Sequence, residues 1–158
     1  ESDNSSRIIS KHNISPNYGY LLARSATGDS FEFSLSSNGT NWDQSGTAGG
    51  TFLVDNWYNV VATFDGTTKR IYINGVEHIG GSFPDSFSGS IFISNGGTEI
   101  GRDGASSLNF TMDGIIDEVR ISNTARSANW ITTEYNNQNS PSTFISFGQE
   151  EKDIWRTT

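Results

Sequence analysis

Short runs in which apolar and polar residues alternate recur along the chain and predict β-strands. In FEFSLS (31–36), the apolar residues Phe31, Phe33 and Leu35 alternate with polar ones. Successive side chains of a strand point to opposite faces, so this pattern buries one face and leaves the other to solvent. Further alternating or apolar runs occupy residues 7–10, 18–25, 57–64, 70–73, 90–94, 98–101, 114–122 and 142–148. Many short strands at this spacing are typical of an antiparallel sandwich or barrel.

Glycine-containing turns separate these runs. The dipeptides Asp65-Gly66 and Asn74-Gly75 readily adopt the left-handed conformations of tight hairpin turns. The chain has 17 glycines and only three prolines, which agrees with many tight turns between short strands. We therefore expect a β-hairpin at each dipeptide.

One segment departs from the strand pattern and predicts a short helix. In residues 127–138, Ile131 and Tyr135 lie four positions apart, and Ser127 can cap the first helical turn. The sequence therefore predicts an all-β domain with one helix in its C-terminal region.

Size and charge narrow the possible partners. At 158 residues the chain has room for one domain, which we expect over residues 1–151, with residues 152–158 as a tail or linker. The net charge of −8 disfavours nucleic acids and anionic membranes, which bind basic patches, and suits divalent cations and neutral ligands. The lack of cysteine excludes disulfides, thiolate metal sites and cysteine nucleophiles. No apolar run approaches the roughly 20 residues that span a bilayer.

The run GIIDEVRIS (114–122) places two carboxylates side by side in an apolar strand pattern. Asp117 shares a strand face with Val119 and Ile121, whereas Glu118 points to the opposite face. Glycosidases place two carboxyl groups about one sugar, roughly 5–5.5 Å apart when retaining and about 6.5–9.5 Å apart when inverting. Neighbouring strand residues diverge and do not meet that requirement. We therefore expect no catalytic residues in this pair and no enzyme activity.

Nucleophilic catalysis lacks support as well. No serine lies in a Gly-x-Ser-x-Gly turn, and the two histidines are His12 and His78. His78 follows a hairpin turn, where exposure to solvent is usual. We expect these histidines at the surface.

Three longer blocks combine the strands, turns and helix in a fixed order. They are DNWYNVVATFDGTTKRIYINGVE (55–77), IGRDG…FTMDGIIDEVRISNTARS (100–127) and WITTEYNNQNSPSTFISFGQEE (130–151). Together they resemble the laminin-G-like domains of the concanavalin A-like lectin/glucanase superfamily, nearest to those of prokaryotic surface proteins. The resemblance implies a jelly-roll sandwich of two curved antiparallel sheets.

The resemblance also implies an incomplete sandwich. Domains of this kind usually begin with further strands, which this chain lacks before its first predicted strand at residues 7–10. An unpaired sheet edge exposes backbone groups that proteins normally cover. We therefore expect contact with another polypeptide along that edge, by strand addition, by packing or by self-association.

Asp117 is the first candidate for a metal ligand. If its strand face is the inner one, its charge needs a cation or several hydrogen bonds. Related domains carry a structural calcium, and the resemblance implies Asp117 as a ligand of Ca²⁺. The alternative is hydrogen bonds to a neighbouring loop or an ion pair with Arg102 or Arg120. Asp113 and Asp103 are weaker candidates because acids beside loop glycines usually form turns.

A polar loop offers the first candidate for glycan contact. Trp42 can stack on a sugar face, and its neighbours Asn41 and Asp43 can bind hydroxyl groups. The alternative is that Trp42 caps the edge of the sandwich. We expect Trp57, at the start of a strand, and Trp130, on the helix, to be packing residues.

These observations favour a non-catalytic extracellular adhesion or carbohydrate-binding module of a prokaryotic surface or secreted protein. Its expected partner is a glycan or a cell-surface protein, without nucleic acid and without membrane insertion. The alternative is a structural domain that assembles with itself or its neighbours into a surface layer or filament. A glycoside hydrolase has the least support.

Overall fold

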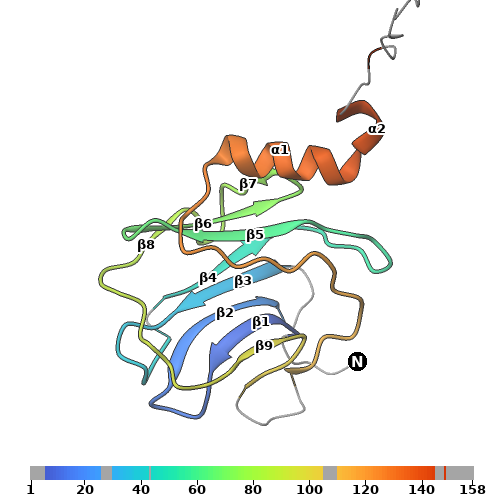
Figure 1. Cartoon of the computed structure of the whole chain (residues 1–158). Coiled ribbons are helices and arrows are strands. Elements are labelled where there is room, and N and C mark those ends of the chain that lie inside the picture. The colour runs from blue at the N-terminus through green and yellow to red at the C-terminus, as the bar shows by residue number, and fades with distance from the viewer. Residues whose placement is uncertain (1–5, 26–29, 43, 105–109, 145–147, 149–158) are drawn as a thin grey trace, which may run out of the picture.

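The structure is a computed structural model that describes residues 6–25, 30–42, 44–104, 110–144 and 148. Its strands form two antiparallel sheets that face each other (Figure 1). The first sheet has the order β4-β3-β2-β1-β9, with β1 (Ser6–His12), β2 (Tyr18–Arg24), β3 (Ser30–Leu35), β4 (Gln44–Gly49) and β9 (Thr98–Ile100). The second has the order β5-β6-β7, with β5 (Val60–Phe64), β6 (Thr68–Ile73) and β7 (Val76–Glu77), and β8 (Asp85–Ser86) also pairs with β6. This arrangement confirms the predicted antiparallel β-sandwich.

The alternating runs of the sequence supply the core between the sheets. Phe31 and Phe33 of β3 are 5% and 7% exposed, and Leu35 is fully buried, as the pattern of FEFSLS predicts. Ile71 of β6 is also fully buried and belongs to the same cluster. From β5, alternate side chains pack against this cluster, namely Val60, Ala62 and Phe64. The period of two therefore identified the inner faces of β3 and β5.

A buried lysine joins the two sheets. Lys69 of β6 is fully buried, and its Nζ lies 3.2 Å from a carboxylate oxygen of Asp85. The same ammonium group donates to the backbone carbonyl of Phe33 and lies 5.7 Å from the Phe83 ring centroid. Burial lowers the pKa of Lys69, and the contact with Asp85 opposes that shift.

The predicted helix is present as α1 (Ala128–Asn139), followed by the short α2 (Pro141–Phe144). Ser127 caps α1, because its hydroxyl oxygen accepts a hydrogen bond from the Trp130 amide at 3.3 Å. α1 covers the second sheet on the side away from the first (Figure 1). Thr132 holds it there by donating to the carbonyl of Gly75 at 2.6 Å.

Two predicted strands, at residues 90–94 and 114–122, are wrong, and the strands β4 and β8 were missed. Residues 90–94 run irregularly over the first sheet, where the Phe92 amide bonds to the carbonyl of Ser36. Residues 114–122 also form no strand, since they pair with no described strand and Glu118 has φ of 53°. β4, with the sequence QSGTAG, was missed because small residues carry no hydrophobic period. Such a strand depends on its neighbour β3 for pairing.

The C-terminal predictions are tested only in part. The prediction of a strand at 142–148 is wrong for residues 142–144, which belong to α2, and residues 145–147 lie outside the described part of the chain. The tail at 152–158 also lies outside it. Within the residues that the structure describes, no helix has the length and hydrophobicity to cross a membrane.

Candidate functional site

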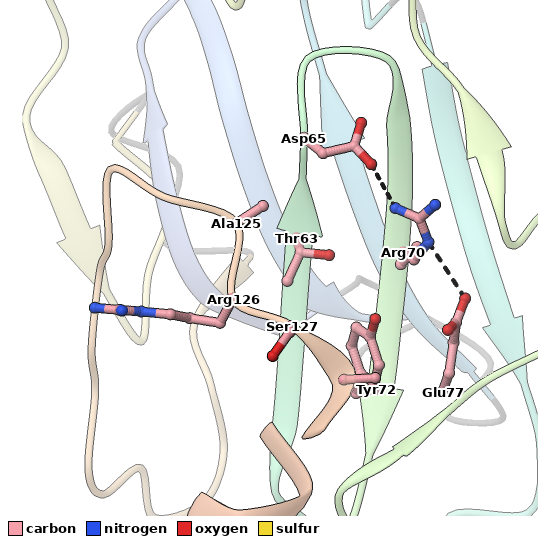
Figure 2. Close-up of a pocket in the computed structure, with 9 residues that line it drawn as sticks. Thr63, Asp65, Arg70, Tyr72, Glu77, Ala125, Arg126 and Ser127 are labelled. Atoms are coloured by element: carbon pink, nitrogen blue, oxygen red, sulfur yellow. Dashed lines mark hydrogen bonds and ion pairs between the residues drawn. The ribbon is translucent and has the colours of Figure 1, made fainter. Parts of the chain in front are cut away.

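The outer face of the second sheet carries a polar pocket of about 360 Å³, which we call the outer-face pocket. Its walls are formed by Thr63, Asp65, Arg70, Tyr72, Glu77 and residues 125–128. Figure 2 shows that the strands present most of these side chains, while the segment that leads into α1 closes one side. The strands of the second sheet, a hairpin turn and the start of α1 therefore meet at this pocket.

Strand register brings the pocket side chains together. Thr63 of β5 lies opposite Arg70 of β6, and Tyr72 follows two positions along the same face. Tyr72 in turn lies opposite Glu77 of β7. The intervening residues point inward to the core, as Ile71 does. The same alternation that buries one face therefore gathers polar groups on the other.

The predicted hairpin turn fixes Asp65. Its Oδ1 accepts hydrogen bonds from the backbone amides of Thr67 and Thr68 at 3.0 and 2.8 Å. Gly66 has φ of 101°, a conformation that a side chain disfavours. The turn thus orients the carboxylate of Asp65 toward the strand face.

Arg70 is held between two carboxylates. Its Nη1 lies 2.6 Å from Oδ2 of Asp65, and its Nε lies 3.5 Å from Oε1 of Glu77. The Arg70 guanidinium lowers the pKa of Asp65, and the backbone amides of the turn lower it further. In return, the hydrogen bond with Asp65 raises the pKa of Arg70. The guanidinium is therefore charged and fixed in orientation.

Tyr72 and Arg126 complete the pocket. Tyr72 is 3% exposed, and its burial raises the pKa of the phenol. Arg126 extends away from Arg70 in Figure 2, with its guanidinium 5.0 Å from the Trp130 ring centroid. The pocket thus presents two carboxylates, a fixed guanidinium, hydroxyl groups and a second guanidinium at its rim. Such a set suits a neutral ligand that both donates and accepts hydrogen bonds.

The residues proposed for glycan contact lie elsewhere. Trp42 stacks on Tyr18, with ring centroids 4.9 Å apart and planes 5° apart, and meets His12 edge-on at 5.4 Å. One face of its ring is therefore covered by the protein. Asn41 is exposed and donates to the Thr40 hydroxyl at 3.3 Å, and Asp43 lies outside the described residues.

The three acids proposed as calcium ligands do not form a cation site in the described part of the chain. Asp117 and Asp113 are exposed, and Asp117 accepts a hydrogen bond from the next amide, that of Glu118, at 2.8 Å. Among the described residues, no three His, Asp or Glu side chains gather in a metal-binding cluster. Calcium needs six to eight oxygen ligands, so this arrangement does not fit the ion.

Asp103 is instead part of a buried ion pair that the sequence did not predict. The expectation of a surface His12 is wrong, because His12 is 4% exposed and its Nε2 lies 2.9 Å from Oδ1 of Asp103. Arg7 approaches the same carboxylate at 3.8 Å. Burial lowers the pKa of His12, and the charge of Asp103 opposes that shift. The only sequence signal is Gly104, whose missing side chain lets the loop approach the carbonyl of His12.

A second depression, the inter-sheet groove, has a volume of about 1990 Å³ and opens between the two sheets. Apolar residues of β2, β3 and β5 line its floor, and residues 52–59 and 112–126 form its rim. The expectation that Trp57 packs in the core is wrong, because it lies on this rim and is 67% exposed. Trp130 is 41% exposed and also lines the groove.

Comparison with known proteins places this sandwich in a family. A laminin G family model, described as the concanavalin A-like lectin/glucanases superfamily, matches residues 1–132. The chain belongs to this superfamily. The match confirms the resemblance for the blocks at 55–77 and 100–127, extends it to the N-terminal residues, and ends at residue 132, near the start of the third block. No curated protein matches the chain.

One solved structure is similar to this member of the superfamily. It is the crystal structure, at 2.1 Å, of residues 221–444 of an S-layer domain-containing protein from Clostridium thermocellum ATCC 27405. The two chains are 22% identical, with a TM-score of 0.37. The similarity covers 85% of this chain, which spans 64% of the length of the other.

Because the superfamily includes glucanases, the placement of Asp117 and Glu118 bears on catalysis. The expectation that they diverge as neighbours on a strand is wrong, since residues 114–122 form no strand and both acids line the inter-sheet groove. Glu118 is nevertheless engaged, because its Oε2 lies 2.6 Å from Nη2 of Arg120. Arg120 also pairs with Glu134 of α1. The Glu118 carboxylate therefore already has a charged partner at the groove.

Proposed function

We propose that this domain is a non-catalytic recognition module of an extracellular surface or secreted protein and that it binds a neutral carbohydrate in the outer-face pocket. The observation that carries the proposal is the fixed position of Arg70 between Asp65 and Glu77. A saccharide hydroxyl donates to a carboxylate and accepts from a guanidinium. Groups already ordered by one another lose little conformational entropy when the ligand binds.

The charge of the pocket supports a neutral ligand. Arg70 contacts both Asp65 and Glu77 and offsets one of their two charges, while Arg126 lines the pocket with its guanidinium turned toward Trp130, so an anion is not favoured. The hydroxyl groups of Thr63 and Tyr72 add two groups that donate and accept. Membership of a superfamily that includes lectins supports the same ligand class.

A glycan array probed with the chain, with and without calcium, tests this proposal. We expect binding in both conditions, because Arg70 already partners both carboxylates without a metal ion. The variant Glu77→Gln is expected to bind the identified glycan at least about tenfold more weakly, since a hydrogen bond to a charged group contributes roughly 1.5–3 kcal/mol. Thr63→Val, which keeps the side-chain shape, is expected to weaken it by a smaller factor.

The matched control is Glu99→Gln. Glu99 pairs with Arg102 as Glu77 pairs with Arg70, and both glutamate side chains are 30% exposed. Glu99 lies on β9, in the other sheet, and does not line the pocket. The proposal is rejected if no glycan binds at any calcium concentration, or if Glu77→Gln and Glu99→Gln affect binding equally.

A further inference from the structure

We propose that the inter-sheet groove binds an extended segment of a different polypeptide, which adds a strand between β5 and residues 115–121. The groove is lined by other residues than those of the outer-face pocket, apart from Thr63 and the segment before α1. The proposal therefore concerns a second ligand, a protein, and does not depend on carbohydrate binding.

β5 offers a free strand edge at this groove. Among the described residues, it pairs with β6 alone. The amide of Asn74 donates to the carbonyl of Asn59, and hydrogen-bonded pairs alternate with non-bonded ones along an antiparallel ladder. Every second residue of β5 therefore points its N–H and C=O away from β6. These residues are Val60, Ala62 and Phe64.

Residues 115–121 form the opposite side of the groove. In Figure 1 the segment passes between the two sheets, and it lines the groove together with β5. Within the described residues, its backbone makes no backbone–backbone hydrogen bond. Ile115 is 77% exposed and Ile121 is 64% exposed. Two backbones without backbone partners on their facing sides thus flank the same space, apart from the Glu118 amide, which donates to Asp117. An inserted strand can pair with β5 along its whole edge and with the second segment on either side of Glu118.

The side chains around the groove favour a bound segment that has one apolar face. Leu22 and Phe33 lie on its floor and are nearly buried, so they offer a packed apolar surface. On the rim, Leu53, Val54 and Trp57 are 62%, 74% and 67% exposed. A segment with apolar residues at every second position places them against this surface, while its other side chains point outward.

Charge favours a neutral or basic segment over a second copy of this chain. The groove lining carries three acids, Asp55, Asp113 and Asp117, and two arginines, Arg24 and Arg126, none of which forms an ion pair with a described residue. These unpaired charges sum to a net negative value. Arg120, in contrast, is already engaged by Glu118 and Glu134. The chain as a whole has a net charge of −8, so two copies repel each other.

Three synthetic peptides of ten residues test the proposal by calorimetry and fluorescence. Each alternates valine with one polar residue, which is lysine, threonine or glutamate. We expect affinity to fall in that order, with at least a tenfold difference between the lysine and glutamate peptides at low salt. N-methylation of every second residue blocks hydrogen bonding along one edge of the peptide. We expect it to weaken binding at least tenfold, whichever edge is methylated.

Variants of the protein locate the site. Ala62→Pro removes an amide that points to the free edge and leaves the β5–β6 ladder intact, so we expect a folded protein with at least tenfold weaker peptide binding. Val54→Ser on the rim is expected to weaken binding severalfold. Its matched control is Ile93→Ser, which changes a side chain that is 90% exposed and lies outside the groove. Circular dichroism reports whether each variant folds.

Several results would overturn the proposal. They are no binding of any of the three peptides, tightest binding of the glutamate peptide, or affinity that N-methylation does not change. Light scattering that shows a dimer, dissociated by Ala62→Pro, would assign the groove to a second copy instead. Glycan binding by the same variants is measured in parallel. If Glu77→Gln alone loses glycan binding, that result concerns the outer-face pocket and does not contradict the proposal for the inter-sheet groove.

Discussion

Single side chains show where alternation is informative and where it is not. The sequence assigned Phe31, Phe33 and Leu35 to the core correctly. That prediction requires only that their segment is a strand and that one of its faces is packed. His12 and Asp103 could not be paired from the sequence, because 91 positions separate them and each alone resembles a surface residue. A contact between a strand end and a distant loop leaves no periodic signal along the chain.

The buried His12 makes stability depend on pH. Its pKa is lowered by burial, so the unfolded chain binds a proton more tightly than the folded one. The free energy of unfolding is therefore expected to be highest above the unfolded pKa of about 6.5 and to fall as pH decreases below it. Thermal unfolding between about pH 8 and pH 5 measures this slope.

Two variants assign the pH dependence to His12. His12→Gln is expected to remove most of the slope below about pH 6.5, since glutamine does not titrate in this range. His78→Gln, which changes the other histidine, is expected to leave the slope unchanged. An equal slope in all three proteins would show that protonation of His12 is not linked to unfolding.

At the level of elements, a pattern predicts a strand only where the fold supplies a partner. The runs that became β1, β2, β3, β5 and β6 each lie beside another strand. The run at 114–122 has the same composition but pairs with no described strand, and Ile115, Val119 and Ile121 remain exposed. β4 shows the converse, because pairing with β3 makes a strand from a sequence without a hydrophobic period.

The outer-face pocket was missed for a related reason. Asp65 was identified as a turn residue, but its carboxylate also fixes Arg70. Glu77 reaches the same guanidinium only through the register of β6 and β7. The sequence contains the hairpins that create this register. Which charged side chains meet across these hairpins becomes evident only once the strand pairing is known.

The start of α1 contributes to the same pocket and depends on one cap. Ser127→Ala removes the side-chain acceptor for the Trp130 amide and is expected to lower the free energy of unfolding by about 1 kcal/mol. Thr133→Ala, at an exposed position inside the helix, is the control, with an expected change within about 0.5 kcal/mol. Urea unfolding midpoints measure both. Equal effects of the two variants would show that the cap contributes no stability.

The whole molecule combines a rigid polar face with an open interior. The second sheet is paired through β5, β6 and β7 and covered by α1, which fixes the outer-face pocket. The space between the sheets is only partly filled, since the inter-sheet groove reaches the core residues of β3. An occupant of the groove therefore completes the core, whereas a ligand of the outer-face pocket binds a surface already formed.

This difference predicts distinct effects of the two ligands on hydrogen exchange. A strand added to β5 gives hydrogen bonds to the amides of Val60, Ala62 and Phe64, which we expect to exchange at least tenfold more slowly with the lysine peptide bound. A peptide at one hundred times its Kd is also expected to stabilise the fold by about 2.7 kcal/mol. A carbohydrate in the outer-face pocket makes no contact with that strand edge. Slower exchange at these three amides with the carbohydrate but not with the peptide would contradict the assignment of the two sites.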